Sequence, residues 1–277
     1  NIGVVIMKAC ALHDIGDIRY EEVEKPEIDS EKILIKVRAS GICGSDIPRV
    51  FKTGTYHFPT IPGHEFAGEI VKTGKNVNNL KPGDRGAVIP LIPCYNCSFC
   101  ERGNYAQCKN YDYMGSRCDG GFAEYVALPA SNFLKFPDNV SFKEGALVEP
   151  AAVALHALRR VQPELGDVVA VLGSGPIGLI IAQLASIMGA KKILLTDIVQ
   201  EKLDFAENMG FSNIFNSKNE DPVKWVKENT IRAGADVVIE AAGVPATFRD
   251  SIMMVRKNGK ITIMGNPKED VLLPRKV

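Results

Sequence analysis

Residues 168–178 read VVAVLGSGPIG, and this stretch decides the expected fold of the second half of the chain. A short apolar strand, Val168 to Leu172, runs into a Gly-x-Gly-x-x-Gly turn and then into an apolar helix. Glycines at such a turn let the backbone approach a pyrophosphate, which binds at the helix N-terminus. The alternative is a glycine turn without a ligand. The pattern predicts dinucleotide binding by Gly173, Gly175, Pro176, Ile177 and Gly178.

Asp197 ends the next expected strand after this turn. An acidic side chain there hydrogen-bonds the ribose hydroxyls of a dinucleotide and repels a 2′-phosphate. The sequence therefore favours NAD over NADP as the cofactor.

The second half of the chain alternates strands with helices, which is typical of a parallel sheet covered on both faces. A doubly wound sheet of two halves has six strands. Either a short fifth strand lies near Phe215 or Val271, or the chain is truncated. Four strands and two helices are clear from the pattern, namely strands 168–172, 193–196, 237–239 and 261–264 and helices 176–188 and 200–209.

The first half is rich in short β-branched runs bounded by Gly, Pro, Asn or Asp, which predicts strands. The sequence pattern changes near Ser141. The stretch over residues 142–160 is rich in Ala and Leu, and its apolar residues have helical spacing. The expected strands cover residues 33–37, 66–71, 85–89 and 122–126.

The 277 residues include 33 basic and 33 acidic side chains, so no net charge attracts nucleic acid or an anionic membrane. No apolar run reaches the roughly 20 residues that span a bilayer. The N-terminus lacks the features of a secretory signal, and residues 1–6 resemble an upstream extension. We expect a cytoplasmic protein with no nucleic-acid or membrane partner.

Four of the seven cysteines lie between Cys94 and Cys108. In a long chain without a secretory signal, such crowding favours metal binding over disulfides. Four thiolates on one tight lobe suit a closed, structural zinc site. Reduced core cysteines, disulfides and an iron–sulfur cluster are the alternatives, although the third spacing differs from that of ferredoxins. The expected ligands are Cys94, Cys97, Cys100 and Cys108.

A second set of metal-binding residue types is dispersed along the chain. Cys43, His64 and Glu149 are suitable ligands for a catalytic zinc, which takes about three protein ligands and keeps one open position. Each also has an ordinary reading as a core cysteine, a buried polar residue or a helix-start acid. Sequence separation alone does not place them together.

These signals, in this order, resemble the zinc-containing medium-chain alcohol and polyol dehydrogenase family. The clearest stretch is Gly63-His64-Glu65 followed by Gly68, Gly74 and Val77, which is similar to the zinc signature of that family. The resemblance implies an α/β protein with a GroES-like β-rich catalytic domain at residues 1–155. A Rossmann domain with a doubly wound parallel sheet would follow at residues 156–277, with the C-terminal part of the usual fold missing.

The resemblance also implies roles for individual residues. Cys43, His64 and Glu149 would bind the catalytic zinc, and Glu65 would either bind it or lie just behind it. Ser45 would pass the substrate proton toward solvent, and Asp46 would orient a ligand. Glu149 stands where simple alcohol dehydrogenases of the family carry Cys, which favours sugar alcohols as substrates.

Within the family, the similarity is greatest to enzymes that act on sugar alcohol phosphates. Arg49, Lys52 and Arg117 lie on segments expected near the zinc and would contact the phosphate. Solvated surface cations are the alternative reading. The expected protein is a homodimer or homotetramer that uses NAD and two zinc ions per chain.

Other readings stay open at this point. One alternative is a related zinc dehydrogenase whose substrate is an unphosphorylated polyol such as sorbitol, a vicinal diol or threonine. A zinc-stabilised nucleotide-binding protein, or an inactive fragment, is the alternative that is not an enzyme.

Overall fold

The computed structural model describes residues 5–231, 234–267 and 269–273. The chain divides into two compact units, Asn1–Glu149 and Pro150–Val277. The division lies inside helix α3 (Val148–Val161), whereas the sequence expectation put it after residue 155.

The first unit is built around an antiparallel sheet with the strand order β8-β3-β4-β5-β9, accompanied by two smaller pairs, β1-β2 and β6-β7. Its strands are β1 (Ile6–Asp14), β2 (Asp17–Glu24), β3 (Lys32–Gly41), β4 (Glu65–Thr73), β5 (Arg85–Val88), β6 (Leu91–Ile92), β7 (Asp112–Tyr113), β8 (Tyr125–Pro129) and β9 (Phe133–Lys135). Its helical segments are α1 (Asp46–Pro48), η1 (Arg49–Thr53), η2 (Cys100–Arg102), η3 (Tyr105–Gln107), η4 (Ala130–Asn132) and α2 (Phe142–Ala146).

Alternation along the strands of this sheet produces its core. Ile33 and Ile35 of β3 point to one face, where they pack with Phe66 and Ile70 of β4 and Leu128 of β8. All five side chains are almost completely buried. The sheet thereby fixes β3 and β4 against each other, and the end of β3 and the start of β4 carry candidate metal ligands.

The single helix expected over residues 142–160 is two helices, α2 and α3. Pro150 explains the break, because it has no N–H to donate and its ring clashes with the carbonyl four residues earlier. In the first turn of a new helix the missing N–H costs nothing, and α3 begins at Val148. Glu149 consequently lies in the first turn of α3.

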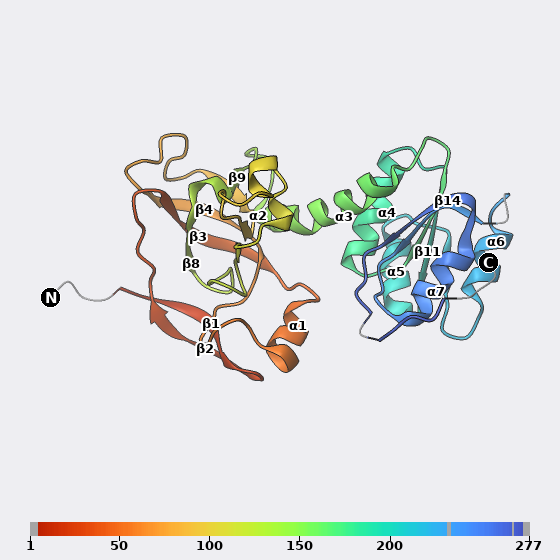
Figure 1. The fold of residues 1–277 in the computed structure, drawn as a ribbon, viewed down its shortest axis with the longest axis horizontal. Helices are drawn as coiled ribbons and strands as arrows, with labels where there is room; N and C mark the ends of the chain where they lie inside the picture. The colour runs from red at the N-terminus through yellow and green to blue at the C-terminus, as the bar shows by residue number, and fades with distance from the viewer. Residues whose placement is uncertain (1–4, 232–233, 268, 274–277) are drawn as a thin grey trace. The chain divides into compact units, whose positions relative to one another are not determined.

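The second unit contains one parallel sheet, with the strand order β12-β11-β10-β13-β14 (Figure 1). The short strand near Phe215 is confirmed as β12, and Val271 is not in a strand. The strands are β10 (Val168–Leu172), β11 (Lys192–Asp197), β12 (Ile214–Asn216), β13 (Ala235–Glu240) and β14 (Val255–Ile263), and the helices after α3 are α4 (Pro176–Ile187), α5 (Gln200–Asn208), α6 (Pro222–Glu228) and α7 (Pro245–Met254).

Helices cover both faces of this sheet, as the continuous apolar strands predict. Val169 and Val171 of β10 pack in a cluster with residues of α3 and α4. Ala170 and Leu172, on the opposite face, pack with Val226 of α6 and Met254 of α7. The expected combination of a GroES-like β-rich unit and a Rossmann parallel sheet is therefore confirmed.

The glycine-rich turn follows β10, the strand that pairs with β11 on one side and β13 on the other. In doubly wound sheets, ligands bind at the carboxyl ends of the strands where the strand order reverses. Gly178 packs so closely on the turn that a Cβ there would lie 1.9 Å from the Gly173 carbonyl oxygen. Of the helices in the described ranges, none is both long and apolar enough to cross a membrane.

Candidate active site

The four clustered cysteines lie on the excursion between β6 and β7. Pairing of these two short strands closes the loop and brings its ends together. The sulfur atoms are 3.4 Å apart for Cys94 and Cys108, 3.6 Å for Cys97 and Cys100, and 4.0 Å for Cys94 and Cys100 and for Cys97 and Cys108. A tetrahedron with Zn–S bonds of about 2.3 Å has edges of about 3.8 Å, so the cluster fits one zinc ion.

Backbone N–H groups in this lobe stabilise the thiolate form of one cysteine, which is the form that binds a metal cation. Those of Lys109 and Cys100 point at the Cys97 sulfur and lower the pKa of that thiol to about 6. Burial instead raises the pKa of Cys100 to about 12. A metal ion must therefore displace at least one thiol proton when it binds at neutral pH.

A second group consists of Cys43, His64 and Glu65, whose ligand atoms all lie within 4.8 Å of one another. Strand register explains how residues so far apart in sequence meet. Gly41 at the end of β3 pairs with Glu65 at the start of β4. A Cβ on Gly41 would lie 2.5 Å from Glu65 Oε2, so the glycine leaves room for this carboxylate.

Asp46 connects two members of this second group, Cys43 and His64. Its side chain accepts a hydrogen bond from the backbone N–H of Cys43 at 2.9 Å and another from Nη1 of Arg49 at 2.9 Å. The same carboxylate lies 3.4 Å from Nδ1 of His64, where it forms an electrostatic contact without hydrogen-bond alignment. Asp46 is only 2% exposed. This is the arrangement of a carboxylate that orients a metal-binding histidine.

His64 is buried, and burial alone would lower its pKa. The side chains of Asp46 and Cys43 outweigh that effect and raise the pKa of His64 to about 10. An ion that binds the imidazole must displace this proton. The negative surroundings thus favour any cation in this place, whether a proton or a metal.

Glu149 lies outside the group formed by Cys43, His64 and Glu65. Its Oε1 accepts a long hydrogen bond of 3.4 Å from the Tyr113 hydroxyl. Burial raises the pKa of Glu149, and the nearby charge of Glu65 raises it further, while His64 lowers it. Of the four catalytic zinc ligands expected from the sequence, the structure brings three together and places Glu149 beside them.

Ser45 is exposed in the turn that follows Cys43 and precedes α1. Its hydroxyl does not cap the helix. The Ser45 hydroxyl is therefore accessible to solvent, two residues along the chain from Cys43.

The three cations expected to bind a phosphate have different surroundings. Arg49 is bound to Asp46. The Arg117 guanidinium is stacked between the rings of Tyr56 and Tyr111, at 3.9 and 4.5 Å from their centroids. Lys52 is exposed in the last turn of η1. Arg49 and Arg117 thus have structural contacts that the sequence did not reveal.

The second unit has a cavity of about 250 Å³ beside the glycine-rich turn, lined among others by Gly173, Gly175 and Asp197. A Cβ on Gly175 would meet only open space, so the backbone at this residue is accessible to a ligand. The carboxylate of Asp197 accepts the backbone N–H groups of Ser174 at 2.8 Å and Val199 at 2.9 Å. Asp197 therefore holds the turn in place and also lines the cavity beside it.

Sequence reasoning missed Glu240, which is fully buried at the end of β13. Its Oε1 accepts hydrogen bonds from the N–H groups of Ala242 and Gly243 and from the Thr247 hydroxyl, at 2.7–2.9 Å. Ala242 and Thr247 line the same cavity. The sequence does contain a signal that could have identified Glu240. It is an acidic residue at the end of an apolar strand, as Asp197 is.

Comparison with known proteins agrees with both halves of this arrangement. Residues 29–138 match the model of the alcohol dehydrogenase GroES-like domain, and residues 176–276 match that of zinc-binding dehydrogenases. The chain is 36% identical to galactitol 1-phosphate 5-dehydrogenase of Escherichia coli K12 over 268 residues, which is 96% of this chain and 78% of that protein. The chain belongs to the zinc-containing medium-chain alcohol and polyol dehydrogenases.

Two further relatives show the breadth of this family. Sorbitol dehydrogenase of Bacillus subtilis is also 36% identical, over 95% of this chain and 76% of that protein. The crystal structure of a zinc-binding dehydrogenase from Sinorhizobium meliloti, bound to NADP, superposes with a TM-score of 0.93 at 34% identity. The match covers 98% of this chain and 80% of that one. As a member of the family, the protein is an oxidoreductase whose cofactors are zinc and a nicotinamide dinucleotide.

Replacing one lobe cysteine should remove one zinc ion. We expect Cys97→Ser to lower the zinc content from about two to about one per chain and to lower the melting temperature, because a structural zinc contributes directly to folding. Metal analysis and calorimetry on the purified protein measure both. Cys10→Ser, outside the lobe, is the matched control, and an unchanged zinc content in Cys97→Ser would contradict the lobe assignment.

Proposed function

We propose that the protein oxidises a secondary hydroxyl of a sugar alcohol, with NAD as the hydride acceptor. The observation that carries this proposal is the group of Cys43, His64 and Glu65, with Asp46 behind it. Three protein ligands leave one zinc position open for the substrate, as catalytic zinc sites require. A protein that only binds nucleotides has no need of an open metal site.

The residues have separate tasks in this proposal. Cys43, His64 and Glu65 would hold the ion, and Asp46 would orient the imidazole. When bound, zinc acts as a Lewis acid that lowers the pKa of a hydroxyl, and the nicotinamide accepts the hydride. Ser45 would take up the hydroxyl proton and release it to solvent. Glu149 would face the substrate rather than the ion.

The dinucleotide would bind in the second unit at the turn from Gly173 to Gly178, with Pro176 and Ile177 opening α4 beneath the pyrophosphate. Asp197 would bind the ribose hydroxyls and so favour NAD. Lys202 lines the same cavity, and its Nζ lies 3.7 Å from Asp197 Oδ2. Without the Asp197 carboxylate, that ammonium group would be free to attract a 2′-phosphate.

The substrate we propose is a sugar alcohol phosphate, with galactitol 1-phosphate as the first candidate. The similarity to galactitol 1-phosphate 5-dehydrogenase supports it, and exposed Lys52 would contact the phosphate. An unphosphorylated polyol is the second candidate. It is favoured by the equal identity to sorbitol dehydrogenase and by the contacts that already engage Arg49 and Arg117.

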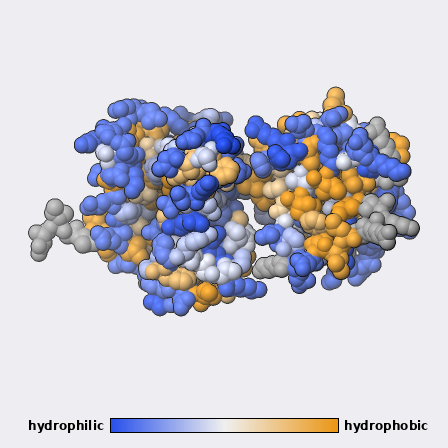
Figure 2. All heavy atoms as spheres, viewed as in Figure 1, coloured by the Kyte–Doolittle hydropathy of each residue, from blue (hydrophilic) through white to orange (hydrophobic). Residues whose placement is uncertain are grey.

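We further propose a cytoplasmic homodimer or homotetramer. All seven cysteines are free thiols, as expected in a reducing compartment. Figure 2 shows a broad apolar stretch on the visible face of the second unit. Exposed apolar side chains of that unit include Ile187 and Leu272, and contiguous apolar surface commonly marks a protein interface. Light scattering of the purified protein measures the oligomeric state.

Loss of His64 should stop turnover but not cofactor binding. We expect His64→Ala to lower kcat by roughly a thousandfold or more, because zinc supplies several kcal/mol of transition-state stabilisation. NAD affinity, measured by fluorescence titration, should stay the same. His156→Ala, an exposed histidine on α3, is the control. Near-normal turnover of His64→Ala would remove His64 from the metal site.

Loss of Asp197 should change the choice of cofactor. We expect Asp197→Ala to weaken NAD binding and to raise the relative use of NADP, since the variant loses the ribose acceptor and leaves Lys202 unpaired. The ratio of kcat/KM for the two dinucleotides measures this effect. Asp204→Ala, an exposed acid on α5, is the control. An unchanged ratio would contradict the proposed ribose contact.

Phosphate dependence separates the two candidate substrates. With galactitol 1-phosphate we expect a higher kcat/KM than with galactitol or sorbitol, and Lys52→Ala should raise KM for the phosphorylated substrate alone. Initial-rate assays of NAD reduction measure both. The control is Lys72→Ala, an exposed lysine on β4. A preference for an unphosphorylated polyol would move the proposal to sorbitol-type chemistry.

A further inference from the structure

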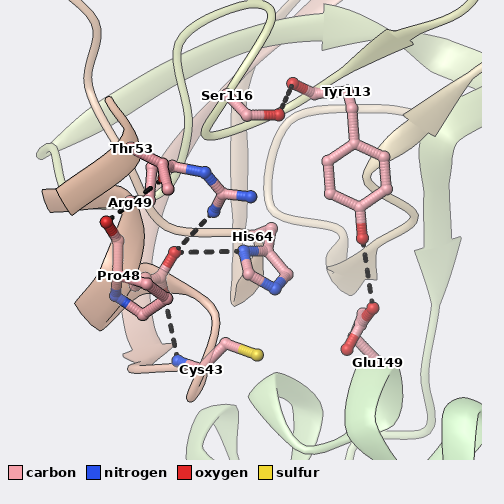
Figure 3. Close-up of polar contacts among 9 residues, drawn as sticks. Cys43, Pro48, Arg49, Thr53, His64, Tyr113, Ser116 and Glu149 are labelled. Atoms are coloured by element: carbon pink, nitrogen blue, oxygen red, sulfur yellow. Dashed lines mark hydrogen bonds and ion pairs between the residues drawn. The ribbon is translucent and has the colours of Figure 1, made fainter. Parts of the chain in front are cut away.

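The ring of Tyr113 lies beside that of His64, and its hydroxyl points toward Glu149 (Figure 3). Its ring centroid is 5.7 Å from that of His64, with the planes tilted by 60°. Its hydroxyl donates to Oε1 of Glu149. One side chain therefore contacts both the proposed ligand group and the acid that stands outside it.

The backbone holds Tyr113 firmly in this position. Tyr113 pairs with Leu91 in the β6-β7 ladder. Its carbonyl oxygen accepts three backbone hydrogen bonds, from Ser116 at 3.2 Å, Arg117 at 2.9 Å and Cys118 at 3.3 Å. The strand pairing and the hydrogen bonds to its carbonyl oxygen fix the backbone of Tyr113. The Tyr113 hydroxyl is therefore held in a defined position, from which it can orient the Glu149 side chain.

The Glu149 carboxylate would move toward a metal ion in the ligand group unless another side chain held it in place. It is partly buried and lies close enough to His64, Glu65 and Asp46 to feel their charges. A cation among Cys43, His64 and Glu65 would attract it strongly, because Coulomb attraction is weakly screened at a partly buried site. A fourth protein ligand would close the coordination position that a substrate oxygen must use.

We propose that Tyr113 is a positioning residue that keeps the Glu149 carboxylate off the metal, so that Glu65 completes the ligand group and one position stays open. This inference rests on the proposed metal site at Cys43, His64 and Glu65. The hydrogen bond from the phenol offsets part of the attraction of Glu149 to the ion and fixes its carboxylate on the substrate side.

The decisive variant is Tyr113→Phe, which keeps the ring against His64 and removes only the donor. We expect Glu149 to join the metal in this variant. Zinc in the second site should then be retained about tenfold longer against a chelator, and kcat/KM should fall roughly ten- to a hundredfold. With cobalt(II) in the site, the visible bands should differ from those of the wild type because the ligand set differs. Tyr20→Phe, an exposed tyrosine on β2, is the control.

Two further variants separate positioning from a merely structural role. Glu149→Gln should leave the cobalt bands and zinc retention of the wild type unchanged, because Glu149 is not a ligand there. The double variant Tyr113→Phe/Glu149→Gln should return both readouts to wild-type values. If Tyr113→Phe fails to fold, Glu149→Gln alone still tests whether Glu149 is a ligand.

Either of two results would overturn the proposal. One is that Tyr113→Phe keeps the wild-type bands, or loses zinc faster, as a loosened site would. The other is that Glu149→Gln alone changes the bands. These readouts need no polyol, so they fail separately from the proposed function, whose failure would be absence of turnover in the wild-type protein.

Discussion

The buried carboxylate of Asp46 is the constraint on which the metal site depends. Burying a charge is costly unless it is paired and hydrogen-bonded. Asp46 meets that requirement with the Cys43 backbone, the Arg49 guanidinium and the proximity of His64. The same contacts set the direction of the loop after β3 and the orientation of the histidine before β4. Stability and function thus use one set of interactions.

The register between β3 and β4 brings the remaining parts of the metal site together. Because Gly41 pairs with Glu65, the residues just beyond the end of β3 meet those just before the start of β4. The second unit has a similar arrangement at the carboxyl end of its parallel sheet. The glycine turn after β10 and Asp197 at the end of β11 line one cavity, and Glu240 at the end of β13 accepts a hydrogen bond from Ala242, which lines it too. In both units, several candidate residues therefore lie at or next to strand ends, where the sheets fix the backbone position.

Sequence patterns predicted those parts of the molecule that depend on local chemistry. The apolar run of β10, the glycine turn and α4 were expected almost to the residue, and the four lobe cysteines were recognised from their spacing. The hairpin of β1 and β2 was not expected, because β2 is largely charged and half-exposed and lacks an apolar alternation. Contacts between segments far apart in the sequence could not be predicted either, because no local pattern encodes them. Nothing near Tyr113 in the sequence indicates Glu149, and nothing near Arg117 indicates that Tyr56 would cover its guanidinium.

We propose that one chain holds two zinc ions with different ligands. Diffraction data collected on both sides of the zinc absorption edge, from crystals of the zinc-loaded protein, test it most directly. We expect two anomalous peaks per chain, one surrounded by the sulfurs of Cys94, Cys97, Cys100 and Cys108 and one bound by Cys43, His64 and Glu65. A single peak at the four-cysteine lobe, or a second peak ligated by Glu149 in place of Glu65, would contradict it.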